Sequence, residues 1–483
     1  MKATTPRAGR ILARLPVAAT AAAAAYLLIA TTVGFFWLDS WHDEQRAAQV
    51  VLLGMIGLAA AWLAIARPPV VAVRLAPAVL VTLALGLASS LLSDRPLDAL
   101  AEVSLFGLLC VLATVVAAFA RTAESGAVLW VSRGALFIAA AHVVGALTRY
   151  AAAVGLDHSL GTEIWLVGFS NPRVASSFYA LLIPFVAAAT IPQVEPDRRL
   201  RAVAWIVLIG LWAVATGLEA RALWMAYAVA VPVLVVMAWT PLTRRMAVTI
   251  GAAALVGVLL QFALQLPFTS EAAASSGTTR DLVSLSAREV LWRLAFGAIL
   301  DSPVLGIGPG QFTSFASYVG AHPHNWVLQV ASEWGLLALL AVLAELLDLL
   351  RRLRPKLRDA QRADHLLTAA SLSALLGLAS ALVDGTLVMP TTQIQFALAF
   401  GLMLGLLHAR QPSSDATDTH STAARVIATC AIAGAAFTLS WHALYTYQLQ
   451  AAEKATFQQR FPGQWLVPRL WESGLSLARQ NGH

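Results

Sequence analysis

Two histidines flank a proline in the stretch His322-Pro323-His324-Asn325, and a long apolar run follows it. Imidazole changes its charge near neutral pH, so a histidine at the edge of an apolar segment is a candidate general base. Proline suits the first turn of a helix, so we expect a helix to begin at His324. The positive potential of a helix N-terminus disfavours the imidazolium form, so His324 is expected to be neutral and able to accept a proton.

A polar stripe continues from His324 into the apolar segment. Asn325, Gln329, Ser332 and Glu333 recur at helical spacing, and such a stripe is expected to face a cavity or partner helices rather than lipid. The alternative is that the histidine only anchors the chain at a membrane interface; the stripe favours a working site. His322 precedes a proline, which favours extended backbone, and we expect its side chain to project from the loop.

An arginine opens a second predicted helix, SAREVLWRLAFGAIL (286–300). The helix is indicated by the capping-box pair Ser286 and Glu289, by the apolar stripe Leu291, Leu294 and Ala298, and by the terminating sequence Asp301-Ser-Pro303. Arg288 then lies in the first turn, where free backbone N–H groups favour an anion. Its guanidinium can hold a phosphate through two parallel hydrogen bonds. The structural alternative, that Arg288 pairs with Asp281 or Glu289, stays open.

Composition shows what kind of chain must position these residues. Hydrophobic residues make up 59% and charged residues 12% of the 483, and the mean hydropathy is +0.72, whereas soluble proteins have about 25% charged residues. We therefore predict an all-α polytopic membrane protein with 12–13 transmembrane helices. The predicted spans are 15–37, 49–66, 75–93, 100–120, 127–147, 177–193, 201–217, 221–240, 246–264, 325–350, 366–383, 391–408 and 424–446.

The distribution of lysine and arginine sets the predicted orientation. The densest basic cluster, 351–362, and the basic N-terminus fall on the cytoplasmic side. This bias accounts for the sequence pI of 9.8, so no nucleic-acid partner is expected. The chain then divides into N-terminal transmembrane helices (1–264), a large outer loop with short helices (265–324), C-terminal transmembrane helices (325–446) and a tail (447–483). The tail is outside with thirteen spans and inside with twelve.

Several arginines lie on the outer side against this trend: Arg46, Arg95, Arg149, Arg173 and Arg221. A cation at membrane depth is costly unless it is paired or faces water. For Arg221, in TGLEARALW, either Glu219 or a bound pyrophosphate could meet that need. The glycine-rich stretch GIGPGQF (306–312) lacks the preceding strand, the following helix and the lysine of a phosphate-binding loop, so it is predicted to be a tight turn.

These segments resemble the O-antigen ligase family of lipopolysaccharide biosynthesis. The family signature is His, then Asn, Ser or Gln, nine residues and Gly, which here runs from His324-Asn325 to Gly335. It continues with two residues and a Gly, Thr or Tyr, where this chain has Ala338. SAREVLW around Arg288 and the following PVLGIGPGQF resemble the large periplasmic loop of the ligase and polymerase superfamily. EARAL around Arg221 resembles its earlier signature arginine, and the likeness spans roughly 165–405.

The resemblance implies a GT-C type membrane glycosyltransferase in the bacterial inner membrane, with its site facing the periplasm. Its donor would be undecaprenyl-pyrophosphate-linked O-antigen, its acceptor lipid A–core, and no cofactor is implied. The signature histidine corresponds to His324 and the two arginines to Arg221 and Arg288. Possible supporting residues are His322, Asn325, Gln329 and Arg173.

The residues suit this chemistry on their own terms. Transfer needs a base for the acceptor hydroxyl, a role for His324, and cations for the departing pyrophosphate, a role for Arg221 and Arg288. Direct displacement would invert the anomeric centre. The outer loops contain no DxD pair, and Asp43 and Glu44 are expected to be solvated, so a metal-independent reaction is predicted. Cys110 and Cys430 lie within predicted spans and are interpreted as core residues.

Three other interpretations remain. An O-antigen polymerase would share the donor, the arginines and the fold, but would extend a lipid-linked glycan. A protein O-oligosaccharyltransferase would share the HPHN-like stretch, although such chains usually have a larger C-terminal periplasmic portion. A transporter should show paired halves with interrupted helices at corresponding positions, and none are evident in the sequence.

Overall fold

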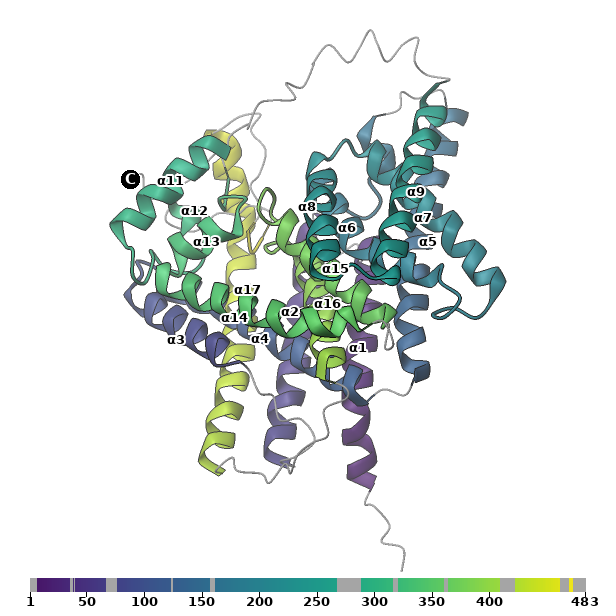
Figure 1. Cartoon of the computed structure of the whole chain (residues 1–483). Helices are drawn as coiled ribbons and strands as arrows, with labels where there is room; N and C mark the ends of the chain where they lie inside the picture. The colour runs from purple at the N-terminus through teal and green to yellow at the C-terminus, as the bar shows by residue number, and fades with distance from the viewer. Residues whose placement is uncertain are drawn as a thin grey trace, which may run out of the picture.

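The computed structural model describes residues 7–34, 38, 40–66, 76–122, 125–156, 161–266, 288–315, 320–359, 364–408, 422–460 and 469–471, and every regular element in these ranges is helical (Figure 1). The first half contains α1 (Arg7–Thr32), α2 (Trp41–Ala66), α3 (Pro77–Leu92), α4 (Pro96–Thr122), α5 (Ser125–Gly155), η1 (Thr162–Trp165), α6 (Pro172–Ala189), α7 (Arg198–Gly217), α8 (Arg221–Met237) and α9 (Pro241–Gln265). The second half contains α11 (Arg288–Asp301), α12 (Phe312–Phe315), α13 (Trp326–Glu333), α14 (Leu336–Arg358), α15 (His365–Ser380), α16 (Pro390–His408) and α17 (Thr422–Arg460).

The protein is an all-α polytopic membrane protein, as predicted. Nine helices in the described ranges are long and apolar enough to cross a membrane, and α3, α8 and α15 are shorter apolar helices. Each predicted span except 325–350 coincides with one helix. Hydropathy succeeds here because a backbone in hydrocarbon must satisfy its own hydrogen bonds, which leaves a helix as the local solution.

The prediction of one continuous helix over 325–350 is wrong. The chain forms the short α13, turns at Gly335, and restarts as α14. Gly335 has φ +87°, and a Cβ there would lie 2.1 Å from the Val304 carbonyl oxygen. Apolar composition conceals this break because the residues on both sides of the glycine are equally hydrophobic. Figure 1 shows α14 running across the view, whereas α1 and α17 run from top to bottom.

Close backbone approaches hold the centre of the bundle together. α6 is buried along almost its whole length, between α5, α7, α15 and α16. Gly401 and Gly405 of α16 face α4 so closely that a Cβ on either would meet a backbone carbonyl at 2.4 Å. Such small residues allow helices in a membrane to pack by van der Waals contact, since lipid supplies little hydrophobic drive.

The outer loop contains short helices, as predicted. α11 buries Leu291 and Ala298 and partly buries Leu294, which confirms the expected stripe, and it ends at Asp301. The capping-box residue Ser286 lies outside the described residues. Gly306, Gly308 and Gly310 all have positive φ, which confirms that GIGPGQF forms tight turns. This glycine loop is fastened to the end of α13 by hydrogen bonds from Ile307 N to Ser332 O (2.9 Å) and from Gly308 N to Glu333 O (3.0 Å).

The tail lies on the same side of the bundle as the His322–Asn325 turn. α17 extends past the predicted span as far as Arg460. Beyond it, Arg469 donates from Nη2 to Glu333 Oε2 at the end of α13 (2.8 Å). The described tail residues 469–471 therefore lie beside the end of α13, and whether that side is inside or outside stays a prediction.

Two predictions about individual side chains need correction. Asp43 and Glu44 are not solvated: Asp43 has no exposed surface and pairs with Lys454 Nζ at 3.2 Å, and Glu44 is 6% exposed. Asp43 is buried against α17, which runs past the membrane-length span to Lys454, and Glu44 accepts from Leu38 N at 3.3 Å. Cys110 and Cys430 are free thiols. Cys110 is half-buried, but Cys430 is exposed on α17 and is not a core residue.

Candidate active site

The His322–Asn325 turn connects α12 to α13. Asn325 is the N-cap of α13, and its side-chain oxygen accepts from Val327 N and Leu328 N at 3.0 and 3.1 Å. His324 has φ +53°, which is left-handed and incompatible with a helix. The prediction that the helix begins at His324 is therefore wrong: an asparagine cap satisfies the open N–H groups, and His324 is the strained residue just before it. Strained backbone of this kind clusters at working sites.

His322 is 2% exposed, so the prediction that it projects from the loop is also wrong. Its Nδ1 accepts from the backbone N–H of His324 (3.2 Å), and the two ring centroids lie 4.1 Å apart. Burial, together with the charges of His324 and Arg469, holds the pKa of His322 well below its usual value. His322 is therefore a neutral, buried residue that holds the backbone N–H of His324 in the turn.

A carboxylate that sequence analysis missed faces His324. Asp384, in the turn between α15 and α16, is 7% exposed, and its Oδ1 lies 3.8 Å from His324 Nδ1. The backbone bond from Trp326 N to Ala381 O (2.9 Å) fixes this turn against the start of α13. The only signal in the sequence was an acidic residue in a very short loop between two predicted spans.

The charge state of Asp384 suits it to orient an imidazole. Burial raises its pKa, but the contact with His324, the Gly385 N–H and the charge of Arg173 outweigh burial and lower the pKa below its usual value. Among the described residues, His324 Nδ1 and Asp384 Oδ2 have no hydrogen-bond partner. Such bonds are often long in an empty site and shorten when substrate binds. With Nδ1 turned to Asp384, Nε2 is the nitrogen that can accept a proton.

Three of the outer arginines each stand in the first turn of a helix. Arg173 follows the Asn171 cap of α6, Arg221 begins α8 and Arg288 begins α11. Partial burial lowers the pKa of Arg288, the charges of Arg173 and Arg221 lower it further, and Asp384 opposes them. Arg288 therefore lies within electrostatic range of Arg173, Arg221 and Asp384. Arg288 Nε is buried and has no hydrogen-bond partner among the described residues.

Arg46, Arg95 and Arg149 contact other groups of the protein. Arg46 and Arg149 donate to backbone carbonyls, and Arg95 lies 3.8 Å from Asp98. Glu289, one of the two carboxylates considered for Arg288, pairs instead with Arg293 at 3.0 Å; Asp281 lies outside the described residues. A like-charged cluster that partly desolvates its members is stable where an anion can bind.

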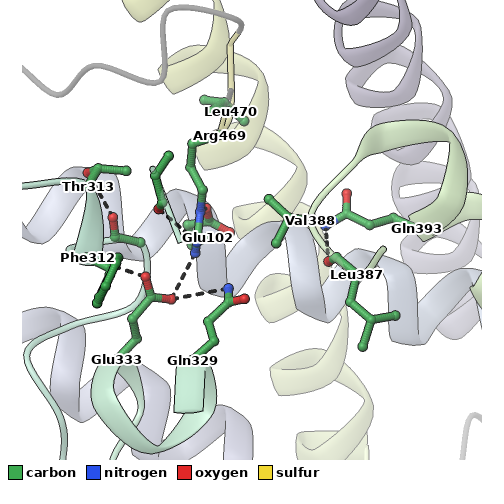
Figure 2. Close-up of polar contacts among 12 residues, drawn as sticks. Glu102, Phe312, Thr313, Gln329, Glu333, Leu387, Val388, Gln393, Arg469 and Leu470 are labelled. Atoms are coloured by element: carbon green, nitrogen blue, oxygen red, sulfur yellow. Dashed lines mark hydrogen bonds and ion pairs between the residues drawn. The ribbon is translucent and has the colours of Figure 1, made fainter. Parts of the chain in front are cut away.

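The polar stripe on α13 faces protein, as predicted. Ser332 and Glu333 have no exposed surface, and Gln329 is half-buried beside Arg469. Figure 2 shows Arg469 reaching from the tail to Glu102 of α4 and Glu333 of α13. Arg469 could not be identified from the sequence, since a lone arginine in a polar tail carries no signal. In the described residues, no three His, Cys, Asp or Glu side chains are placed to hold a metal ion.

Residues 204–343 match the family model described as O-Antigen ligase. The match runs from α7 into α14 and contains Arg221, Arg288, His324 and Gly335. This segment of the chain is similar to the O-antigen ligase family. A search of curated proteins finds no match to the chain. Members of the O-antigen ligase family are membrane enzymes of the glycan-transferring, ligase type, which in general act on a lipid-linked glycan and lipid A–core. Arg173 and Asp384 lie on either side of the matched segment, and only folding brings them to it.

Proposed function

We propose that this protein transfers O-antigen polysaccharide from undecaprenyl pyrophosphate to lipid A–core at the periplasmic face of the inner membrane. The observation that carries the proposal is the juxtaposition of His324 and Asp384 with the cluster of Arg173, Arg221 and Arg288. The His324–Asp384 pair can take a proton from a hydroxyl, and the arginine cluster can hold a pyrophosphate. A ligase using a diphosphate-linked donor needs both together.

His324 is the proposed general base. Its Nε2 takes the proton of the acceptor hydroxyl as that oxygen attacks the anomeric carbon of the donor sugar. Asp384 at Nδ1 holds the imidazole in place and stabilises the positive charge that the ring gains, as a carboxylate does behind a catalytic histidine. The neutral, buried His322 fixes the backbone N–H of His324 and keeps a second positive charge out of the turn.

The arginine cluster is the proposed leaving-group site. As the new glycosidic bond forms, the bond between the anomeric carbon and the pyrophosphate oxygen breaks, and its electron pair stays on undecaprenyl pyrophosphate. Arg288, whose Nε has no hydrogen-bond partner among the described residues, binds this charge together with Arg221 and Arg173, assisted by the N-terminal ends of their helices. A single displacement of this kind inverts the anomeric centre, uses no metal in our proposal, and is consistent with a GT-C type enzyme.

The orientation and the domain limits belong to the same proposal. The loop 265–324 and the tail would face the periplasm, with the transmembrane helices of 1–264 and 325–446 on either side of the loop in sequence. The basic residues of 351–362 would face the cytoplasm.

Two experiments test the proposed function. In a deletion strain, accumulation of unligated lipid-linked O-antigen supports a ligase, whereas lipid A–core capped by single repeats identifies a polymerase. With purified protein, donor and lipid A–core, His324→Ala should lose about 10²–10⁴-fold in rate while still binding the donor. The matched control is His408→Ala, which should keep the wild-type rate. His408 is the last residue of α16, at the other end of that helix from the Asp384 turn. If folded His324→Ala turns over normally, His324 is not the base.

A further inference from the structure

A three-residue piece of the tail is built into the protein interior. Arg469 is 5% and Trp471 is 7% exposed. Trp471 Nε1 donates to Thr446 Oγ1 of α17 (2.9 Å), and its ring centroid lies 5.1 Å from that of Tyr447. A tail segment that is buried in this way is held by side chains on several helices.

Arg46 of α2 binds the backbone of this segment. Its Nε donates to Leu470 O (3.0 Å) and its Nη2 to Arg469 O (3.1 Å). The same Nη2 donates to Val388 O (2.6 Å), in the turn that carries Asp384. One buried guanidinium therefore connects the tail to the turn that presents the proposed orienting carboxylate.

The side chain of Arg469 binds two other helices, α4 and α13. Its Nε donates to Glu102 Oε1 of α4 (2.7 Å) and its Nη2 to Glu333 Oε2 of α13 (2.8 Å), as Figure 2 shows. With its amide oxygen turned to the guanidinium, Gln329 accepts from Nη1 and Nη2 at 3.1 Å each. Arg469 thus contacts Gln329 and Glu333, which lie one helical turn apart on α13.

Glu333 depends on this contact. It has no exposed surface, and among the described residues Arg469 is the cation that forms an ion pair with it. Burial raises the pKa of Glu333, and the charge of Arg469 opposes that rise. A buried carboxylate that loses its partner must take up a proton or move towards water. Either response would disturb α13, whose other end is the N-cap Asn325 directly after His324.

We propose that Arg469 is a positioning residue of the active site. The segment 469–471 holds α13 through Glu333 and Gln329, and holds the Asp384 turn through Arg46, so that His324 stays opposite Asp384. His324 directly precedes the N-cap of α13, whereas Asp384 lies on the α15–α16 turn. The tail segment contacts Glu333 of α13 directly, and it contacts Arg46, which binds the α15–α16 turn. This inference rests on the proposed function for its catalytic part, and on the contacts alone for its structural part.

The test compares Arg469→Gln with wild-type protein and with Arg293→Gln, a control whose exposed pair with Glu289 lies on α11. Hydrogen–deuterium exchange is measured over 322–334, and kcat and KM are measured per amount of monodisperse, folded protein. Arg469→Gln should exchange faster over 322–334 and lose about 10²-fold in kcat, the cost of a small misplacement of reacting groups. KM for donor and acceptor should stay within a factor of about three, because substrate-binding groups are untouched. Arg469→Lys, which keeps the charge but reaches one carboxylate at a time, should be intermediate, and it carries the test if Arg469→Gln is not recovered folded.

The outcomes separate the positioning role from a merely stabilising one. If Arg469 only stabilises the fold, folded Arg469→Gln turns over at the wild-type kcat, and the proposal is overturned. Unchanged exchange over 322–334 overturns it as well. If the wild-type protein itself transfers no glycan, the proposed function fails, while the exchange comparison still decides whether the tail holds α13.

Discussion

Replacing Asp384 by asparagine removes a charge and leaves the shape of the side chain almost unchanged. The carboxylate lies 3.8 Å from His324 Nδ1, and the imidazole becomes positive when it takes the proton of the acceptor. At that separation and an effective dielectric constant of about 20, opposite charges attract by about 4 kcal/mol. Since about 1.4 kcal/mol corresponds to a tenfold change in rate, losing the whole interaction would lower kcat about 10³-fold.

The expected loss for Asp384→Asn is about 10²–10³-fold in kcat, because the neutral amide keeps a dipole but loses the charge that attracts the imidazolium. KM should change little, since the charge matters only once the proton has moved. The assay measures initial rates of glycan transfer from the lipid-linked donor to lipid A–core with purified, monodisperse variants. Asp348→Asn serves as the control, since Asp348 is an exposed partner of Arg352 on α14.

A double substitution tests the pairing itself. If Asp384 acts through His324, then Asp384→Asn should cost little more once His324 is already alanine, because the two residues work as a unit. Independent, multiplying losses would refute the pairing. A wild-type kcat in folded Asp384→Asn would refute the role of the carboxylate altogether.

The other predictions concern the arginine cluster, the topology and the buried histidine. Arg288→Lys should slow transfer and Arg288→Ala slow it more, because lysine keeps the charge but loses the two-pronged geometry; the same order is expected at Arg221, and wild-type rates in both inserted alanine variants would rule out a pyrophosphate role. In a chain without its own cysteines, a cysteine at Ser275 should react with a membrane-impermeant thiol reagent on spheroplasts and one at Ala360 should not; the reverse labelling would overturn the orientation. Burial lowers the pKa of His322, so below about pH 6.5 the unfolded chain binds a proton that the folded protein does not. The free energy of unfolding should therefore have its full value above that pH and fall by about 1.4 kcal/mol per pH unit below it. His322→Gln should flatten this dependence, and an unchanged pH profile of thermal unfolding would contradict the assignment.

Much of the fold could be predicted from the sequence because membrane insertion is governed by local composition. An apolar run of membrane length must become a helix in hydrocarbon, so nearly every predicted span is a single helix. The exception at Gly335 has a physical cause that hydropathy does not register: a backbone turn made against Val304. The arginines predicted to face outwards could also be identified from the sequence. Only the structure shows that Arg46, Arg95 and Arg149 bind groups of the protein, and that Arg173 and Arg221 lie near Arg288.

The sequence by itself determined the class of the protein and the helix that begins at Arg288, since each depends on neighbouring residues. Only the tertiary structure decided which groups meet. Asp384 comes to His324 because the turn between α15 and α16 is hydrogen-bonded to the start of α13 through Trp326 N and Ala381 O. Arg469 comes to Glu333 across 136 residues of chain because the tail after α17 returns to the end of α13. Composition and periodicity describe residues that are close along the chain. A buried charge pair depends on how distant helices pack, because a buried charge is costly unless that packing brings it a partner.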